Sequence, residues 1–89
     1  MTTAFIQHKV TDYNDWKQVY DSVAEMQKHD GVIAQAVYQS VEDPNDVTVT
    51  HEFVSLEAAQ AFLASDDLKQ AMEHAHVASK PTVWYGNKA

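Results

Sequence analysis

The order of elements in this sequence is strand, helix, strand, strand, helix, strand, which predicts the ferredoxin-like split-βαβ fold of the α+β class. Residues 47–53 alternate β-branched and polar side chains with period two, as in a half-buried strand. Residues 16–26 carry apolar side chains at helical spacing. Residues 43–46, Asp-Pro-Asn-Asp, form a dense turn signal that predicts an antiparallel hairpin. We therefore expect one domain over residues 1–89, with an antiparallel four-stranded sheet covered by helices on one face.

The first half of the chain predicts a strand over residues 3–10 and then a helix. Asp12 is a candidate N-cap, with Asp15 three residues later in a position like that of a capping box. The apolar stripe predicts that the helix continues without a break to residues 28–30. Gly31 then stands where a left-handed C-cap is needed.

The second half predicts two strands, an interrupted helix and a short last strand. Ser55 is the expected N-cap of the helix, and Ser65, Asp66 and Asp67 can cap a second segment that begins near Leu68. The chain from residue 86 is expected to be loose. The predicted strands are residues 32–41, 47–53 and 82–85.

In this topology we expect strands 3–10 and 47–53 to be adjacent and parallel at the centre of the sheet. The helices then cover one face and leave the other bare. A bare face that is partly apolar, on so small a domain, favours pairing with a second copy, so we expect a homodimer. The residues assigned to this face are Phe5, Gln7, Lys9, Ile33, Gln35, Val37, Thr48, Thr50 and Glu52.

The composition argues against several classes of partner. The net charge is -7 with only 6 Lys and Arg, so we expect no binding of nucleic acid or of an anionic membrane. The N-terminus lacks a signal-peptide pattern and no stretch approaches a membrane span, so we expect a cytoplasmic protein. With 2 glycines and no cysteine, there is no Gly-rich phosphate loop and no thiol chemistry. No resident cofactor is expected.

Two histidines are the candidate catalytic residues. His8 and His51 each stand in an otherwise apolar row, on strands that the topology makes neighbours. We expect them at the same level of the sheet under the helices, where imidazoles can move protons near neutral pH. Trp16 and Phe62, on the helix stripes, would form the flat apolar wall of a pocket.

A structural role for these residues is the alternative. A buried histidine is commonly hydrogen-bonded to a hydroxyl, and Tyr20, Tyr38 or Tyr85 could supply one. Trp16 has the position of an ordinary core residue.

His74 and His76 form an H-x-H pair near the end of the last helix. Residues two apart on a helix point in different directions, so these two cannot share a metal there. If the helix ends by residue 75, one of them could fold over the mouth of the pocket and contact substrate. There is no other metal-ligand spacing, and no metal is expected.

Several stretches, residues 8–17, 43–47, 52–63 and 83–85, together resemble the antibiotic biosynthesis monooxygenase-like proteins, and above all their small bacterial members labelled "cyclase" or monooxygenase. The resemblance implies a dimeric α/β barrel, in which two ferredoxin-like subunits pack sheet against sheet. It also implies a pocket between the sheet and helices of each subunit.

The resemblance has consequences for the site. Many relatives carry an aromatic residue at the end of the third strand and a histidine in the following helix, and these positions are similar to Phe53 and Phe62 here. The apolar ring at Phe62 makes haem ligation and haem degradation improbable. Where many relatives have an acid in the third strand, this chain has His51.

Three functions remain open from the sequence. The first is a cofactor-independent monooxygenase or a cyclase acting on a small hydrophobic, aromatic or polyketide-like metabolite. Its base would be His8 or His51, and its pocket would be shaped by Trp16, Phe53, Phe62 and Trp84. The second is a binding protein that uses the same cavity without catalysis. The third is a structural dimer whose pocket is filled by Trp16 and Phe62.

Overall fold

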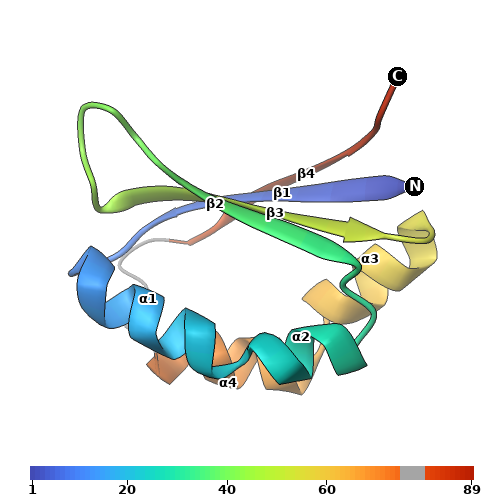
Figure 1. Ribbon diagram of the computed structural model, residues 1–89, viewed down its shortest axis with the longest axis horizontal. Helices are drawn as coiled ribbons and strands as arrows, with labels where there is room; N and C mark the ends of the chain where they lie inside the picture. The colour runs from blue at the N-terminus through green and yellow to red at the C-terminus, as the bar shows by residue number, and fades with distance from the viewer. Residues whose placement is uncertain (75–79) are drawn as a thin grey trace.

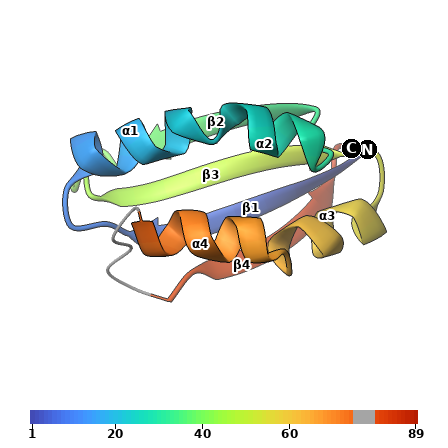
Figure 2. The ribbon, with the colours of Figure 1, turned by 90° about the horizontal axis from the view of Figure 1, so that it is seen from below.

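The computed structural model describes residues 1–74 and 80–89, except for the side chain of His74. Within these residues, one antiparallel sheet has the strand order β2-β3-β1-β4, and four helices lie together on one of its faces (Figures 1 and 2). This confirms the predicted fold class, with a sheet that is open rather than closed. The strands are β1 (Thr2–Lys9), β2 (Ala34–Gln39), β3 (Asp46–Phe53) and β4 (Thr82–Asn87). The helices are α1 (Tyr13–Ser22), α2 (Ala24–His29), α3 (Leu56–Leu63) and α4 (Asp66–His74).

The two central strands, β1 and β3, are antiparallel, so the expectation of a parallel pair was wrong. The crossover through α1 and α2 makes β1 and β2 parallel, with room for one strand between them. The β2–β3 hairpin places β3 in that gap in the opposite direction. Adjacent strands therefore run in opposite directions across the whole sheet.

Side-chain caps begin the helices where the sequence predicts them. The Asp12 carboxylate accepts a hydrogen bond from the Asp15 backbone N–H at 3.2 Å. Ser55 caps α3 through the N–H of Ala58, also at 3.2 Å. Ser65 caps α4 in the same way through Leu68, which confirms that the last helix is interrupted.

The first helical segment is divided at Val23, although the sequence predicted one continuous helix. Val23 has φ -102° and ψ 13°, outside the helical range. The Ser22 hydroxyl donates to the Val19 carbonyl at 2.6 Å, and such local bonds bend helices. Gly31 has φ 102°, which confirms the left-handed C-cap.

The last strand extends further toward the C-terminus than the sequence predicted. Gly86 and Asn87 pair with Thr3 and Thr2 at the end of β4. The Thr2 hydroxyl donates to the Asn87 side-chain oxygen at 2.8 Å. Part of the tail predicted to be loose therefore belongs to the sheet.

The core lies between the sheet and the helices. The inward residues of β1 and β3 alternate strictly with outward ones, and they are buried. One cluster gathers around Trp16 of α1 and the other around Phe62 of α3. The inward residues of the two central strands are Thr2, Ala4, Ile6, His8, Val47, Val49, His51 and Phe53.

The side chains of β2 lie on the opposite faces of the sheet from those that the sequence predicted. Gln35 lies beside His51 and Val37 beside Val49, so both face the helices instead of the bare face. Because side chains alternate with period two, a one-residue error in the hairpin register exchanges the two faces.

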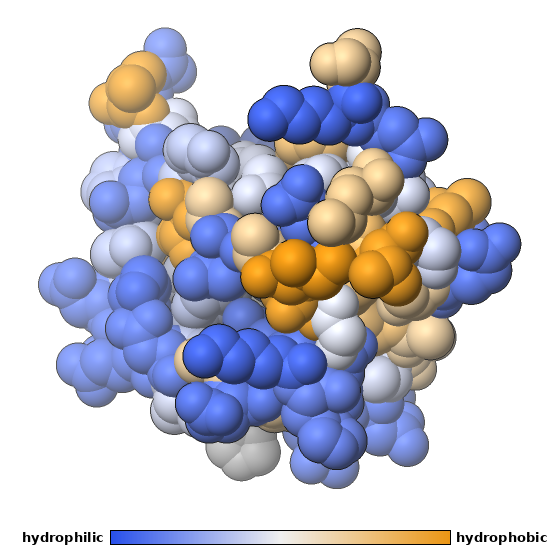
Figure 3. Space-filling view, turned by 45° about the vertical axis from the view of Figure 1, so that its right-hand side comes forward, coloured by the Kyte–Doolittle hydropathy of each residue, from blue (hydrophilic) through white to orange (hydrophobic). Residues whose placement is uncertain are grey.

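The other face of the sheet has no layer over it among the described residues. Phe5 of β1 and Trp84 of β4 are cross-strand neighbours whose rings stack at 5.5 Å between centroids, 4° from parallel. Trp84 is 44% exposed and Tyr38 is 58% exposed. Figure 3, a view of one side of the molecule, shows an apolar patch bordered by hydrophilic side chains. In the described ranges, the helices are all too short or too polar to cross a lipid bilayer.

Candidate active site

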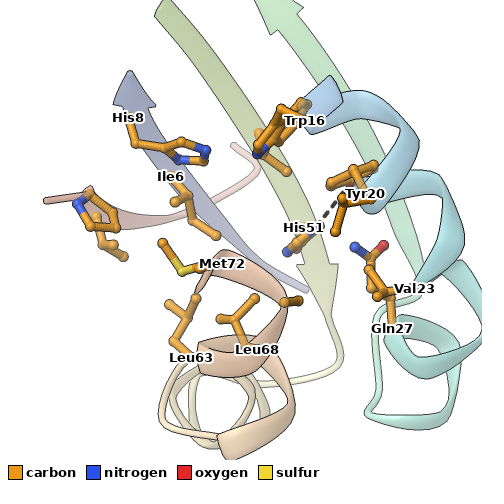
Figure 4. Close-up of a pocket in the computed structure, with 15 residues that line it drawn as sticks. Ile6, His8, Trp16, Tyr20, Val23, Gln27, His51, Leu63, Leu68 and Met72 are labelled. Atoms are coloured by element: carbon orange, nitrogen blue, oxygen red, sulfur yellow. Dashed lines mark hydrogen bonds between the residues drawn. The ribbon is translucent and has the colours of Figure 1, made fainter. Parts of the chain in front are cut away.

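A cavity of about 130 Å³ lies between the sheet and the helices. Its lining side chains are apolar except for two imidazoles, one phenol hydroxyl, one amide and the indole N–H of Trp16, and Figure 4 shows these groups extending from β1, β3, α1 and α2. Leu68 and Met72 close the side that belongs to α4. The lining residues are Ile6, His8, Trp16, Val19, Tyr20, Val23, Gln27, Val49, His51, Leu63, Leu68, Ala71, Met72, Pro81 and Val83.

His51 of β3 is the more deeply buried histidine, with 2% of its surface exposed. Its Nε2 atom lies 3.2 Å from the Tyr20 hydroxyl, which donates to the Gln35 side-chain oxygen at 2.6 Å. Its Nδ1 atom is buried without a hydrogen-bond partner in the described structure. Burial disfavours the charged imidazolium and lowers the pKa of His51 to about 4. His51 is therefore neutral in the free protein at physiological pH.

Tyr20 is held as a neutral phenol by the same environment. Burial raises the pKa of Tyr20 to about 12, and the nearby Asp21 carboxylate acts in the same direction. The Gln27 side chain, hydrogen-bonded to this hydroxyl, opposes the rise in the Tyr20 pKa. Tyr20 therefore supplies hydrogen bonds at this point, not a charge.

His8 of β1 is 6% exposed, and neither ring nitrogen has a hydrogen-bond partner in the described structure. Burial lowers the pKa of His8, while the Asp46 carboxylate acts in the opposite direction. The ring makes an edge contact with Trp16 at 5.7 Å between centroids. Both candidate histidines thus present unpaired nitrogen atoms in side chains that line the cavity.

The two histidines line one cavity but do not lie at the same level of the sheet, as the sequence had suggested. In the antiparallel register His8 is opposite Val47, while His51 is opposite Ala4. Four residues of strand separate the two levels by roughly 13 Å. Trp16 and Tyr20, with ring centroids 5.0 Å apart, occupy the helix side between them. The histidines therefore line different parts of the cavity.

The other candidate site residues are divided among three places. Phe53 and Phe62 pack together at 5.5 Å and contact the His51 ring, outside the cavity lining. Trp84 lies on the opposite face of the sheet, so the structure does not bring it to this cavity. His74 is the last residue of α4, with a side chain outside the description, and His76 lies outside the described residues.

Trp16 lines the cavity but does not fill it, and Phe62 belongs to the core behind His51. A pocket filled by these two rings, the third possibility from the sequence, therefore does not describe this structure.

Sequence reasoning missed two amides near His51. Gln27 is a polar residue one helical turn beyond Val23 on the buried stripe, and it is 4% exposed. A polar side chain in an apolar stripe was the available signal for Gln27. Gln35 was assigned to the wrong face of β2. Tyr20, in contrast, had been named as a possible partner for a buried histidine, and its contact with His51 confirms this.

Over the described residues, no group of three or more His, Cys, Asp or Glu side chains is placed to hold a metal ion. The arrangement instead offers neutral imidazole nitrogens in an apolar cavity, which can accept protons or hydrogen bonds from a bound molecule.

This fold agrees with the comparisons. Residues 2–74 match the sequence model of the antibiotic biosynthesis monooxygenase family, and the chain belongs to that family. No curated protein sequence gives a match.

Solved structures in the family share the fold at low sequence identity. A candidate antibiotic biosynthesis monooxygenase from Bordetella bronchiseptica has a TM-score of 0.87 at 16% identity, covering 99% of this chain and 96% of that chain. Another from Deinococcus radiodurans has a TM-score of 0.73 at 20% identity, covering 100% and 95%. SnoaB from Streptomyces nogalater, a cofactor-independent oxygenase, has a TM-score of 0.76 at 12% identity, covering 99% and 94%. At these identities the likeness establishes the fold alone.

Proposed function

We propose that this protein is a cofactor-independent oxygenase for a small, electron-rich hydroxylated aromatic molecule, with His51 as the base. The observation that carries the proposal is that His51 lines a largely apolar cavity and that its Nδ1 is buried without a hydrogen-bond partner in the described structure. A buried acceptor without a partner costs about 1–3 kcal/mol, so a bound hydroxyl group would remove a real penalty. SnoaB, which has the same fold, is a cofactor-independent oxygenase, and this supports the class of reaction.

The cavity supports a substrate of one aromatic ring. Its volume of about 130 Å³ is close to the engineered apolar cavity of about 150 Å³ that holds benzene. Trp16 provides a flat apolar wall, Val49 adds an apolar contact, and His51 lies at one level of the cavity, where it can meet one hydroxyl group. We take resorcinol as the simplest probe of this class.

The reaction with resorcinol balances with O₂ alone. Proton transfer from a hydroxyl to His51 Nδ1 gives a phenolate whose carbon para to the oxygen carries negative charge. That carbon forms a bond to O₂, and the resulting hydroperoxide loses water as its O–O bond breaks. One oxygen atom enters the ring and the other leaves as water, so resorcinol becomes hydroxybenzoquinone. The substrate supplies all four electrons.

A low pKa for His51 does not prevent this proton transfer. The imidazolium that forms lies beside the new phenolate, and the attraction between opposite charges in an apolar site offsets the cost of burying each.

A binding protein without catalysis is the second candidate. The observation in its favour is that burial lowers the pKa of both His8 and His51, which weakens them as bases. The experiment below separates it from the oxygenase.

The first step of the experiment measures binding. In a Trp84→Phe variant, Trp16 is the remaining tryptophan of the two in the chain, so its fluorescence reports on the cavity. Resorcinol, 1,3-dihydroxynaphthalene and 1,3-dihydroxyanthracene form a series of one, two and three rings. We expect quenching by resorcinol and much weaker quenching by the three-ring compound.

The second step measures O₂ uptake and quinone absorbance with the compound that binds. We expect His51→Gln to lower kcat by about 100- to 10,000-fold, the range for a general base, with little change in binding. His29→Gln is the matched control, because the His29 side chain is 89% exposed. Tight binding without O₂ uptake by the wild type would favour the binding protein, while absence of binding across the series would refute both.

The same proposal includes a homodimer formed through the bare face of the sheet. The Phe5–Trp84 stack and the exposed Tyr38 ring give this face an aromatic surface that a second sheet could cover. Two such open sheets packed together would give the barrel that the sequence resemblance implies.

A further inference from the structure

The Tyr20 hydroxyl is the branch point of the hydrogen bonds around His51. A hydroxyl has one proton to donate and two lone pairs that accept. Tyr20 donates its proton to the Gln35 side-chain oxygen at 2.6 Å, a shorter contact than the one with His51. The Gln27 side chain is hydrogen-bonded to the same hydroxyl. With the Tyr20 proton on Gln35, the 3.2 Å contact with His51 Nε2 is a hydrogen bond only if the imidazole N–H donates and the Tyr20 oxygen accepts (Figure 4).

We propose that Tyr20 and Gln35 are positioning residues that hold His51 in the tautomer with its proton on Nε2, which leaves the lone pair on Nδ1. The use of that lone pair as a base rests on the proposed function. The tautomer itself is a property of the protein without ligand.

The opposite tautomer satisfies fewer groups. If Tyr20 turned its proton toward Nε2, the Gln35 oxygen would lose its donor. Nδ1 is buried without a partner in the described structure whichever tautomer is present, so the Tyr20–Gln35 hydrogen bond makes the difference between the two. The other rings that contact His51 belong to Phe53 and Phe62, which offer neither donor nor acceptor.

Gln35 does not line the cavity, but its position on β2 lets it set the preferred tautomer of His51 through Tyr20. Gln35 is the cross-strand neighbour of His51 on β2, and its side chain faces the helices beside the Tyr20 hydroxyl. Gln35 is itself exposed, at the sheet edge formed by β2. Replacing it therefore changes the hydrogen bonding of Tyr20 without opening the core.

The test is long-range ¹H–¹⁵N NMR of the imidazole rings, which distinguishes a protonated from an unprotonated ring nitrogen. Near pH 7, where His51 is neutral, we expect the wild type to show a proton on Nε2 and none on Nδ1. In Gln35→Leu the Tyr20 proton becomes free to bond Nε2, so the main tautomer should change to the one protonated on Nδ1. Tyr20→Phe should give a mixture of the two.

Gln39→Leu is the matched control. Gln39 is another glutamine of β2 on the same face, but its side chain donates to the Pro44 carbonyl at 3.4 Å. We expect the tautomer of His51 to be unchanged in this variant. A wild-type His51 protonated on Nδ1, or a tautomer that is the same in Gln35→Leu as in the wild type, would overturn the inference.

Kinetics then separate this inference from the proposed function. If His51 Nδ1 is the base, Gln35→Leu should lower kcat with resorcinol about tenfold or more, because the competent tautomer becomes the minor one. KM should change little. If the wild type has no oxygenase activity, the proposed function fails while the NMR result still decides the role of Tyr20 and Gln35.

Discussion

The burial of a neutral His51 should make the folded protein lose stability as the pH falls below 7. In the unfolded chain this imidazole has its ordinary pKa of 6.5, while in the folded protein the pKa is lowered to about 4. Below pH 6.5 the unfolded state binds a proton that the folded state does not, so acid favours unfolding. The loss ends near pH 4, where the folded state binds the proton as well.

The size of the effect follows from the two pKa values. The full difference of 2.5 units corresponds to about 3 kcal/mol, and about 2 kcal/mol of this is lost between about pH 7 and about pH 5. His8, whose pKa is also lowered by burial, adds a loss of the same sign. The difference between wild type and His51→Gln isolates the contribution of His51.

The assay is urea unfolding at about pH 7, 6 and 5, at one fixed protein concentration because association would shift the apparent stability. We expect the wild type to lose about 2 kcal/mol more than His51→Gln over this range. The His29→Gln variant, which alters an exposed imidazole, should lose as much stability over this pH range as the wild type. If wild type and His51→Gln lose stability in parallel, His51 is not a buried neutral histidine and the reasoning fails.

Two further predictions concern the core and the bare face of the sheet. Phe62 is 2% exposed and packs on Phe53, so Phe62→Ala should cost about 3–5 kcal/mol in urea unfolding. A cost below about 1 kcal/mol would contradict this packing. Trp84→Glu places a charge on the proposed dimer interface and should give a monomer by light scattering. Val41→Glu, at a fully exposed loop position, should remain a dimer, and a monomeric wild type would refute the interface.

The sequence by itself determined the class of fold and most element boundaries, because these depend on local properties. The alternation in residues 47–53 marks a strand with one buried face, and Ser55 and Ser65 can cap helices whatever lies across the sheet. The burial of His8 and His51 also followed from this alternation. The break in the helix at Val23 did not follow from the sequence, because neither Gly nor Pro is present at that point.

The tertiary structure alone decided how the candidate site is assembled. The antiparallel pairing of β1 and β3 sets His8 and His51 at different levels, and the hairpin register turns Gln35 toward the helices. The pairing of β4 with β1 puts Trp84 on the far face. Tyr20 reaches His51 across 31 positions of sequence only because α1 packs over β3. Such contacts depend on pairing, register and packing between distant segments, and local patterns do not encode them individually.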